Sequence, residues 1–458
     1  VVEPAEVAAD AYDYEDVVKT AVAEVSAFPK EALKLNQELA KELGFDSLMF
    51  VDLGTALQKA VPTLKAIPQD AFNVKTTIGE VIEFLEGAVN NDTLEDSDSS
   101  EFYVDEELSR YVPALIARPL PWLPGDTRLT ADSHVAIVGE SGTLASELSL
   151  ELNARGISNE LVPMGTELPK NTTAMIYLGA RGIHTTASEA LKSLPDVLTP
   201  LRHYAVKLYG LTGGQPDALV VLTDAGFDGL HSGSCPLQAG VTSMAKALHR
   251  EWHHTQVKAI DLSEKPTEST HARIALDELW SAADDVEVVY SGDTRYVVAL
   301  EEAPFHPKGL GFTKTDVVLI TGGTRGIGAK VAIEIAKRSK AKLVIASRSP
   351  ESKLGQNAKA NLDAMKASGS VVTYLEWDVT EAPNKAAVKA LKEVNAFIHS
   401  AGIIRDKEIQ EKTPEDFDAV TAVKVQGFLN VMGALDANKL RLVVGFGSWA
   451  GRFGNRGQ

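Results

Sequence analysis

The sequence predicts a multidomain protein in which a small all-α bundle is followed by two α/β units with parallel sheets. Three observations lead to this fold class. The 458 residues exceed a single hydrophobic core, since roughly 150 residues per domain is usual. Apolar residues recur at helical spacing up to about residue 88, and after about residue 101 short β-branched runs alternate with helical stretches. A polar, acidic stretch separates these two regions.

The first region, residues 12–88, is expected to form a helical bundle. Three stretches place apolar residues on one helix face, which is the pattern of helices that bury one side. These residues are Val17, Val18, Ala21, Val22 and Val25, then Leu48, Val51, Leu53 and Leu57, then Ile78, Val81, Ile82 and Leu85. Residues 89–100, VNNDTLEDSDSS, have little apolar surface to bury and are expected to form a flexible linker.

Two α/β units follow, over residues 101–307 and 308–458. Continuous apolar runs predict strands that are buried on both faces, as in parallel sheets covered by helices. In the first unit these runs are 134–138, 174–178, 218–223 and 257–260, with a helix at 239–252 and a closing strand pair within 286–300. In the second unit they are 316–320, 342–346, 373–377, 396–399 and 440–445. Both units are therefore predicted to be Rossmann-like.

The composition argues against several classes of function. A net charge of -18 disfavours nucleic-acid or anionic-membrane partners, because both require a basic surface. No apolar run approaches the ~20 residues of a membrane span. The one cysteine, Cys235, cannot form an internal disulfide, so a reducing cytoplasm is expected. The acidic start, residues 1–16, argues against a signal peptide, which would be basic there. Because the first residue is not methionine, we expect the chain to be a piece of a longer polypeptide.

The second α/β unit carries a nucleotide-binding motif. The strand at 317–320 runs directly into TGGTRGIG and then into a helix at 329–337. Glycines suit a tight strand-to-helix turn that lets the backbone approach a pyrophosphate at the helix N-terminus. The residues assigned to this cofactor site are Gly322, Gly323, Thr324, Arg325, Gly326, Ile327 and Gly328.

The residues after the next strand favour NADPH over NADH. An NAD enzyme would place an acidic residue there for the ribose 2′-hydroxyl, whereas this chain has Ser347 and Arg348. A hydroxyl and a guanidinium suit a 2′-phosphate, with Arg325 as a further candidate. The alternative is that Arg348 is a solvated surface residue. Asp378 and Val379 after the third strand are expected near the adenine, and Ser400, Ala401 and Gly402 after the fourth near the nicotinamide.

The motifs TGGTRGIG, WDVT, HSAG, KVQG and GFGSWAGRFGNRGQ together resemble the short-chain dehydrogenase ketoreductase domains of multifunctional polyketide and fatty acid synthases. The resemblance implies that Lys424 and Ser448 are catalytic, and it places the family's tyrosine about three residues beyond Gln458. Ser448 would donate a hydrogen bond to the β-carbonyl oxygen as hydride arrives on carbon, the tyrosine would deliver the proton, and Lys424 would lower the pKa of the tyrosine. Asp406 resembles the residue that steers the thioester, although Arg405 departs from that pattern. The alternative for Lys424 is an ordinary lysine on the surface of a helix, and the alternative for Ser448 is a serine that ends a strand or caps a helix.

The first α/β unit is not expected to bind a nucleotide. Its first strand is followed by Gly139-Glu140-Ser141-Gly142, which lacks the spacing of a phosphate loop and places an anion there. The runs RYVPALIARPLP, QAGVTSMAKALHREWHHTQVKAIDL and VEVVYSGDTRYVVAL resemble the structural subdomain of the same ketoreductases. His249, His253 and His254 have no carboxylate or cysteine to complete a metal set, so no metal is expected.

The stretch LGFDSLM at residues 43–49 resembles the phosphopantetheine attachment site of acyl carrier domains. The resemblance implies that Ser47 receives 4′-phosphopantetheine from a phosphopantetheinyl transferase. Glu42, Asp46 and Asp52 would suit docking to basic patches. The alternative is that Asp46 and Ser47 only cap a helix.

Taken together, these resemblances imply a carrier–ketoreductase segment of a type I iterative synthase, most similar to polyunsaturated fatty acid synthases. It would reduce a carrier-bound 3-ketoacyl thioester to the 3-hydroxyacyl thioester with NADPH. Its implied partners are ketosynthase, acyltransferase and dehydratase domains of the same or a companion synthase. Two alternatives remain: a non-catalytic carrier scaffold, and a free-standing dehydrogenase for a small alcohol. The carrier region and the duplicated α/β unit argue against the second.

Overall fold

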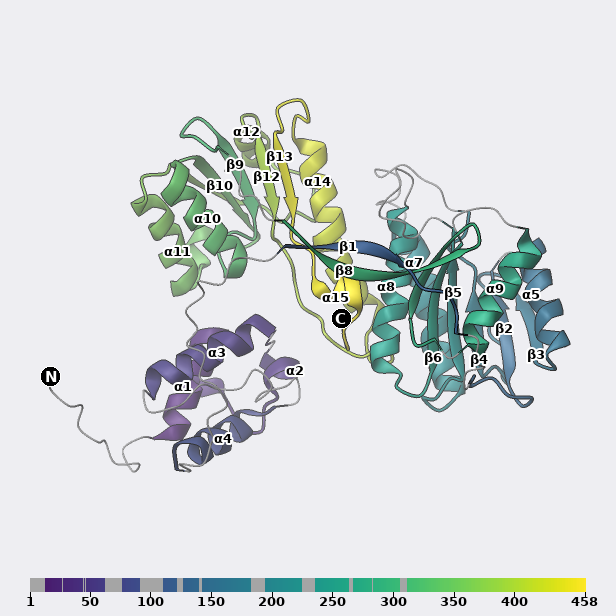
Figure 1. The fold of residues 1–458 in the computed structure, drawn as a ribbon. Coiled ribbons are helices and arrows are strands. Elements are labelled where there is room, and N and C mark those ends of the chain that lie inside the picture. The colour runs from purple at the N-terminus through teal and green to yellow at the C-terminus, as the bar shows by residue number, and fades with distance from the viewer. Residues whose placement is uncertain are drawn as a thin grey trace. The chain divides into compact units, whose positions relative to one another are not determined.

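The computed structural model describes residues 13–26, 28–43, 45, 47–61, 76–90, 110–121, 127–139, 142–182, 194–224, 235–262, 267–281, 283–304 and 311–458. The chain forms two compact units, one of residues 1–107 with 353–360 and one of residues 108–352 with 361–458 (Figure 1). Residues 91–100 of the predicted linker, together with Asp46 and Glu140, lie outside the described residues. The bundle and the two α/β sheets confirm the predicted fold class.

The first unit is a helical bundle. Its elements are α1 (Tyr14–Ser26), η2 (Lys30–Ala32), α2 (Leu39–Leu43), α3 (Ser47–Ala60) and α4 (Ile78–Asn90). Side chains from the helices α1 to α4 and from the chain between them form one core: Val18, Ala21, Val22, Leu33, Leu39, Leu43, Phe45, Leu53, Leu57, Val61, Ile78, Val81 and Leu85. A capping box precedes α4, because Glu80 Oε2 accepts from the Thr77 N–H at 2.7 Å and Thr77 Oγ1 accepts from the Glu80 N–H at 3.3 Å.

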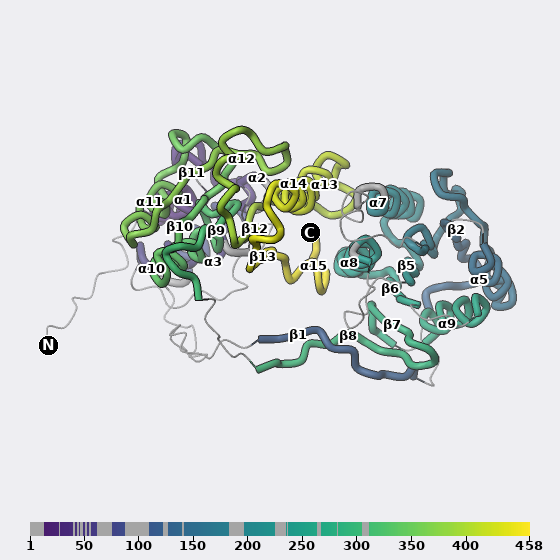
Figure 2. Tube along the Cα trace, turned by 90° about the horizontal axis from the view of Figure 1, so that it is seen from above, coloured from purple at the N-terminus to yellow at the C-terminus, as the bar shows by residue number. Residues whose placement is uncertain are grey.

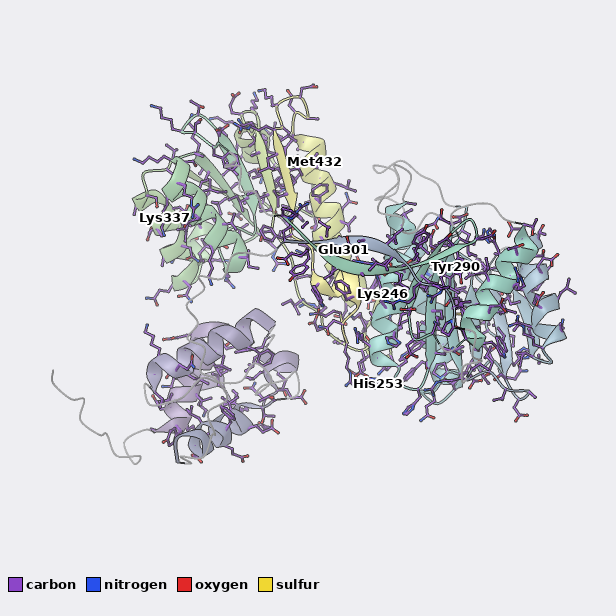
Figure 3. All side chains as sticks on the ribbon, in the orientation of Figure 1. Lys246, His253, Tyr290, Glu301, Lys337 and Met432 are labelled. Carbon is purple, nitrogen blue, oxygen red and sulfur yellow. The ribbon has the colours of Figure 1, made fainter. Side chains whose placement is uncertain are left out.

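The second unit begins with the structural half, an eight-stranded sheet of order β1-β8-β7-β6-β5-β4-β2-β3. Its strands are β1 (Arg110–Ala117), β2 (His134–Val138), β3 (Ser158–Val162), β4 (Ala174–Tyr177), β5 (Ala218–Thr223), β6 (Gln256–Leu262), β7 (Glu287–Ser291) and β8 (Thr294–Ala303). Strands β2 to β7 are mutually parallel. Its helices are α5 (Thr143–Ala154), α7 (Leu194–Leu211), α8 (Pro236–Glu251) and α9 (Glu268–Trp280). Buried side chains form two core clusters, one on each face of this sheet, and Tyr290 (Figure 3) belongs to one of them.

Strand β1 pairs with β8 as a long antiparallel ribbon (Figure 2). The register runs from Arg110 opposite Ala303 to Ala117 opposite Tyr296. Strand β1 lies at the sheet edge and is mostly exposed. Pro113 is tolerated within it because an edge strand has one side that needs no ladder hydrogen bonds.

The rest of the second unit, which carries the predicted cofactor site and the candidate catalytic residues, is called the catalytic half. It contains a five-stranded parallel sheet of order β11-β10-β9-β12-β13. The strands are β9 (Val317–Thr321), β10 (Lys342–Ser347), β11 (Val372–Glu376), β12 (Ala396–His399) and β13 (Leu442–Gly445). The helices are α10 (Gly326–Ser339), η3 (Glu351–Lys353), α11 (Gln356–Ala367), α12 (Lys385–Leu391), α13 (Pro414–Thr421), η4 (Ala422–Gln426), α14 (Gly427–Ala434) and α15 (Trp449–Phe453). Residues 353–360, which include the start of α11, group with the first compact unit, and the rest of α11 groups with the second. The strand order reverses between β9 and β12, and open α/β sheets bind their ligands at such a point.

Among the described residues, no helix is long and apolar enough to span a membrane. The same residues contain no group of three or more His, Cys, Asp or Glu side chains arranged to hold a metal ion.

Candidate active site

The glycine turn between β9 and α10 is packed against the end of β12. Gly322 has φ 68° and Gly326 has φ 53°, values in the left-handed region that favours glycine. A Cβ added at Gly322 would lie 2.8 Å from the Ala401 backbone, and one added at Gly328 would lie 2.6 Å from Ser400 Oγ. The turn therefore requires glycine at these positions. It brings the backbone of residues 322–328 beside residues 400 and 401, where the strand order reverses.

Helix α10 begins at Gly326, and Arg325 is its N-cap residue without a side-chain cap hydrogen bond. The first N–H groups of a helix have no acceptor within the helix and carry partial positive charge. This end is therefore chemically suited to a phosphate. Thr324 is buried, whereas Arg325 and Ile327 are exposed.

Two further pairs of predicted cofactor residues follow the carboxyl ends of β10 and β11. In the sheet, these two strands lie on one side of β9, and β12 lies on the other. Ser347 is the last residue of β10, and Arg348 follows it with an exposed side chain. After β11, Asp378 Oδ1 accepts from the Thr380 N–H at 3.0 Å and from its hydroxyl at 2.8 Å. Val379 is buried against Gly427, where an added Cβ would lie 2.8 Å from a Val379 methyl.

His399, the last residue of β12, joins the turn to the helix that carries Lys424. Its Nε2 lies 3.2 Å from Val423 O, a carbonyl that can only accept, so Nε2 donates and Nδ1 accepts from Thr321 Oγ1 at 2.9 Å. Burial, together with the positive charge of Lys424, lowers the pKa of His399 to about 4. The imidazole is therefore a neutral structural link.

Lys424 lies in a π-helical segment between α13 and α14. Its Nζ donates to Phe446 O at 3.3 Å, and a Cβ added at Gly402 would lie 3.0 Å from the same Nζ. Burial lowers the pKa of Lys424. A π segment inserts an extra residue into a helical turn, and such segments are frequent at functional sites.

Ser448 is the N-cap residue of α15 and is exposed. Its Oγ accepts from the Ala450 N–H at 3.2 Å. Ser448 therefore does cap a helix, as the alternative interpretation held. Its Oγ is only an acceptor in this cap, so the hydroxyl proton can still be donated to a substrate.

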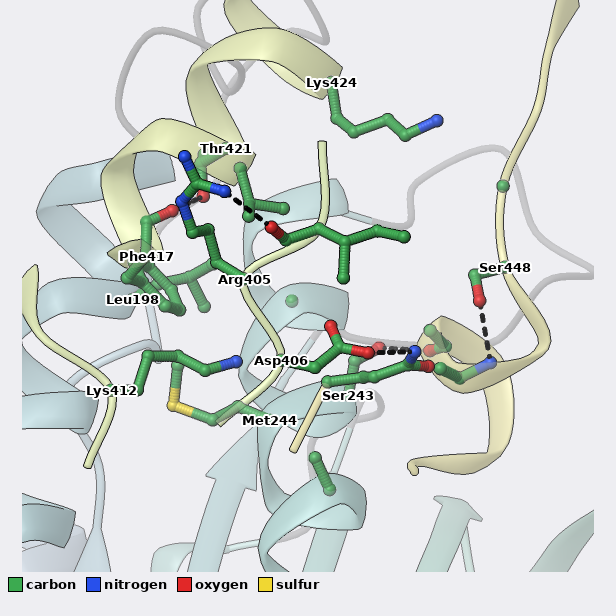
Figure 4. A pocket seen from close by; sticks show the side chains of 18 of the residues that line it. Leu198, Ser243, Met244, Arg405, Asp406, Lys412, Phe417, Thr421, Lys424 and Ser448 are labelled. Carbon is green, nitrogen blue, oxygen red and sulfur yellow. Dashed lines mark hydrogen bonds between the residues drawn. The ribbon is translucent and has the colours of Figure 1, made fainter. Parts of the chain in front are cut away.

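Lys424, Asp406 and Ser448 line one pocket of about 700 Å³ in the second unit (Figure 4). Helices α7 and α8 of the structural half supply part of its wall, including Leu198, Ser243, Met244 and Glu251. Asp406 Oδ2 accepts from Gln458 Nε2 at 2.8 Å. No sequence motif assigns residues of the structural half to the site, because their approach depends on how the two halves pack.

The sequence-predicted residues thus fall into three groups. Lys424, Ser448 and Asp406 share the pocket, which His399 also lines, and Gly402 packs against the Lys424 side chain. Ser347, Arg348, Asp378 and Val379 lie at the ends of the two neighbouring strands. Ser47 begins α3 in the other compact unit.

A protein-family model matches part of each of the two compact units. The model described as "KR domain" matches residues 316–458, and the model described as "Phosphopantetheine attachment site" matches residues 16–85. The chain therefore contains a phosphopantetheine carrier domain and a ketoreductase domain.

The relatives identify the kind of protein in which these domains occur. Polyketide synthase PksN of Bacillus subtilis (strain 168) is 31% identical over 238 residues, 49% of this chain and 4% of the relative. A polyunsaturated fatty acid synthase subunit of Thraustochytrium sp. (strain ATCC 26185 / S-3) is 22% identical over 550 residues, 97% of this chain and 19% of the relative. The chain thus spans less than a fifth of the length of either. It is a carrier and ketoreductase segment of a polyketide or polyunsaturated fatty acid synthase.

Solved structures share the fold. An N-terminal ketoreductase from the macrolactin assembly line has a TM-score of 0.61 at 20% identity, covering 76% of each chain. The first ketoreductase of the tylosin polyketide synthase has a TM-score of 0.59 at 23% identity, covering 76% of this chain and 75% of that one. At these identities the likeness supports the two-sheet architecture alone.

Proposed function

We propose that this segment holds an acyl chain as a phosphopantetheine thioester on Ser47 and reduces its 3-ketoacyl form to the 3-hydroxyacyl form with NADPH. The observation that carries the proposal is the shared pocket of Lys424, Asp406 and Ser448. His399 also lines this pocket and is hydrogen-bonded to Thr321, the residue before the glycine turn. Apolar side chains such as Leu198, Met244 and Phe417 line the same pocket, and they suit an acyl chain.

The residues of the catalytic half fit a dinucleotide. Glycine at 322 and 328 lets the turn pack closely against residues 400 and 401. A Gly-rich turn from a strand into a helix of this kind presents its backbone to a pyrophosphate at the helix N-terminus. Ser347, Arg348 and Arg325 would bind the 2′-phosphate, Asp378 and Val379 would lie at the adenine, and Ser400, Ala401 and Gly402 at the nicotinamide. NADPH bound there supplies the hydride.

Residues of the chain then stabilise the negative charge that develops on the carbonyl oxygen of the substrate. As the carbonyl carbon accepts hydride, its oxygen becomes negative, and the Ser448 hydroxyl donates a hydrogen bond to it. The proton that completes the alcohol comes from the tyrosine expected beyond Gln458. Lys424, whose pKa is lowered by burial, holds that hydroxyl and favours its ionisation. Asp406 directs the thioester so that one face of the carbonyl meets the cofactor.

The proposal includes the context of the segment. The domains extend over residues 12–88 for the carrier, 89–100 for the linker, 101–307 for the structural half and 308–458 for the catalytic half. A phosphopantetheinyl transferase modifies Ser47 in the cytoplasm. Ketosynthase, acyltransferase and dehydratase domains exchange the acyl chain with the carrier, and the linker gives the carrier its reach and raises the local substrate concentration.

The test is NADPH oxidation by a polypeptide extended some tens of residues past Gln458, with a 3-ketoacyl pantetheine thioester as substrate and NADH as the cofactor control. We expect NADPH-selective turnover that falls by about 10²–10⁴-fold in Lys424→Ala and Ser448→Ala. Lys439→Ala, at an exposed lysine elsewhere in the catalytic half, should leave the rate unchanged. A folded polypeptide that binds NADPH but reduces nothing would favour the non-catalytic carrier scaffold.

A further inference from the structure

We propose that Glu251, a residue of the structural half, is a positioning residue for the reductase pocket because its carboxylate fastens together two backbone segments of the catalytic half. The inference rests on the proposed function. It adds a role for the structural half beyond supporting the fold.

Glu251 is the last residue of α8, and it lines the pocket. Its Oε2 accepts from the Ile409 N–H at 2.8 Å, and its Oε1 accepts from the Gly457 N–H at 3.1 Å. Ile409 belongs to the loop that follows β12, and Gly457 to the segment that follows α15. One carboxylate therefore bridges two segments that are far apart in the sequence.

The two segments are also joined directly to each other. Gly457 O accepts from the Lys407 N–H at 3.0 Å and from Lys412 Nζ at 2.8 Å. The next residue, Gln458, donates from Nε2 to Asp406 at 2.8 Å. Gln458 thus holds Asp406, and its neighbour Gly457 is bound by Glu251.

The other end of the bridge is anchored in the structural half. The Ile409 side chain is buried and belongs to the core cluster that also contains Leu248 and Trp252. Its N–H is therefore fixed next to α8. If Glu251 loses its hydrogen bond to Gly457, the Gly457 segment keeps only its bonds to residues 406–412 and loses its direct link to α8. The Gly457 segment and Asp406 can then shift relative to this anchor.

A carboxylate is the side chain that this geometry requires. Two backbone N–H groups approach it, and an ionised carboxylate offers an acceptor oxygen to each. Burial raises the pKa of Glu251, whereas both N–H donors and the positive charge of Lys412 favour its ionised form. Glutamine would offer one acceptor oxygen and turn an NH₂ group toward the second N–H, where donor faces donor.

The experiment compares the extended polypeptide with Glu251→Gln, Glu251→Asp and the control Glu167→Gln, which replaces an exposed carboxylate of the same half. The readouts are kcat and KM for the 3-ketoacyl pantetheine thioester, the configuration of the 3-hydroxy product, the Kd for NADPH, and amide hydrogen exchange. Displacement of reacting groups by about 1 Å can cost about 10²-fold in rate.

We expect Glu251→Gln to lower kcat/KM by about 10- to 100-fold, to yield mixed product configurations, and to leave the Kd for NADPH unchanged. Exchange should accelerate at residues 403–412 and 455–458 and not across the sheet. Glu251→Asp, which keeps both acceptor oxygens on a shorter side chain, should partly restore activity and configuration. Glu167→Gln should match the unsubstituted protein.

Unchanged kinetics, configuration and exchange in Glu251→Gln would overturn the inference. If Glu251→Gln does not fold, the test rests on Glu251→Asp, because a carboxylate one methylene shorter cannot keep both hydrogen bonds at their present lengths. In that case, wild-type kinetics, product configuration and hydrogen exchange in Glu251→Asp would overturn the inference. If the unsubstituted polypeptide does not reduce the substrate, the proposed function fails, and hydrogen exchange still decides whether Glu251 holds the two segments.

Discussion

Gly322 and Ala401 meet where β9 and β12 end, so closely that a Cβ on residue 322 would lie 2.8 Å from both N and Cα of Ala401. The two strands are neighbours in the sheet and diverge toward different helices. This contact makes the glycine turn and the 400–402 segment one rigid surface at the point where a dinucleotide would cross the sheet.

Replacement of Gly322 by alanine should therefore impair both stability and cofactor binding. The residue has φ 68°, and holding a non-glycine residue in a sparsely populated region costs about 1–3 kcal/mol, before the collision with Ala401. We expect the free energy of unfolding in urea to fall by at least that amount and NADPH binding to weaken. Gly433→Ala is the matched control, since its Cβ meets nothing within 4 Å in α14; a loss there of similar size would contradict the explanation.

Arg348→Ala should reduce the preference for NADPH. Its guanidinium follows β10 with an exposed side chain, free to reach a 2′-phosphate. A hydrogen bond to a charged group is worth about 1.5–3 kcal/mol, so the Kd for NADPH should rise by roughly 10- to 100-fold while that for NADH stays constant. Fluorescence titration measures both values. Arg338→Ala, exposed at the far end of α10, should change neither; equal losses for the two cofactors in Arg348→Ala would remove the 2′-phosphate role.

His399 should make the stability of the reductase depend on pH. Its pKa is lowered to about 4 in the folded protein, mainly by burial, against about 6.5 in an unfolded chain. The unfolded state then binds more protons at His399 between these values, so the contribution of His399 to stability should fall as the pH drops from about 6.5 to about 4 and be constant above about 6.5. The free energy of unfolding at pH 7 and pH 5 should differ less in His399→Gln. The exposed His203 gives the control His203→Gln, which should keep the wild-type difference.

Glu287→Gln should loosen α15 and, with it, Ser448. Glu287 of β7 binds Arg452 of α15 at 2.8 Å and Lys246 of α8 at 3.1 Å, and Ser243 Oγ donates to Gly451 O at 2.7 Å. Because the ion pairs are largely buried, loss of the charge leaves two cations poorly compensated. We expect a lower melting temperature and a lower kcat, with the Kd for NADPH unchanged.

The control for Glu287 is Glu301→Gln, at an exposed position of β8 (Figure 3). It removes the same charge without affecting a contact to α15. If kcat is the same in Glu287→Gln and Glu301→Gln, the ion pairs of Glu287 with Arg452 and Lys246 do not set the position of Ser448.

Much of the fold could be predicted because its central strands are apolar on both faces. The expected strands at 134–138, 218–223 and 396–399 have those bounds in the structure, as β2, β5 and β12. Strands β1 and β3 were not predicted. Strand β1 contains Pro113 and is largely exposed, and β3, with the sequence SNELV, buries only Val162. Neither has the continuous apolar run on which the predictions depended.

The site was predictable where a motif is local and unpredictable where it depends on packing between distant segments. The glycine turn is read from eight adjacent residues, and Lys424, Ser448 and Asp406 came from a resemblance. The π segment around Lys424 has no local pattern that distinguishes it from an ordinary helix. The approach of Glu251 to Gly457 depends on how α8 meets the catalytic half, which no periodicity encodes.

The most direct measurement is the mass of the acyl group on the carrier. A 3-ketoacyl pantetheine group is loaded onto Ser47 of the extended polypeptide, NADPH is added, and the mass of the attached group is measured by mass spectrometry. We predict a gain of two hydrogens with NADPH, little with NADH, and none in Lys424→Ala; Ser47→Ala should carry no acyl group at all. A loaded, folded protein whose acyl mass does not change with NADPH would contradict the claim that this segment is a reductase.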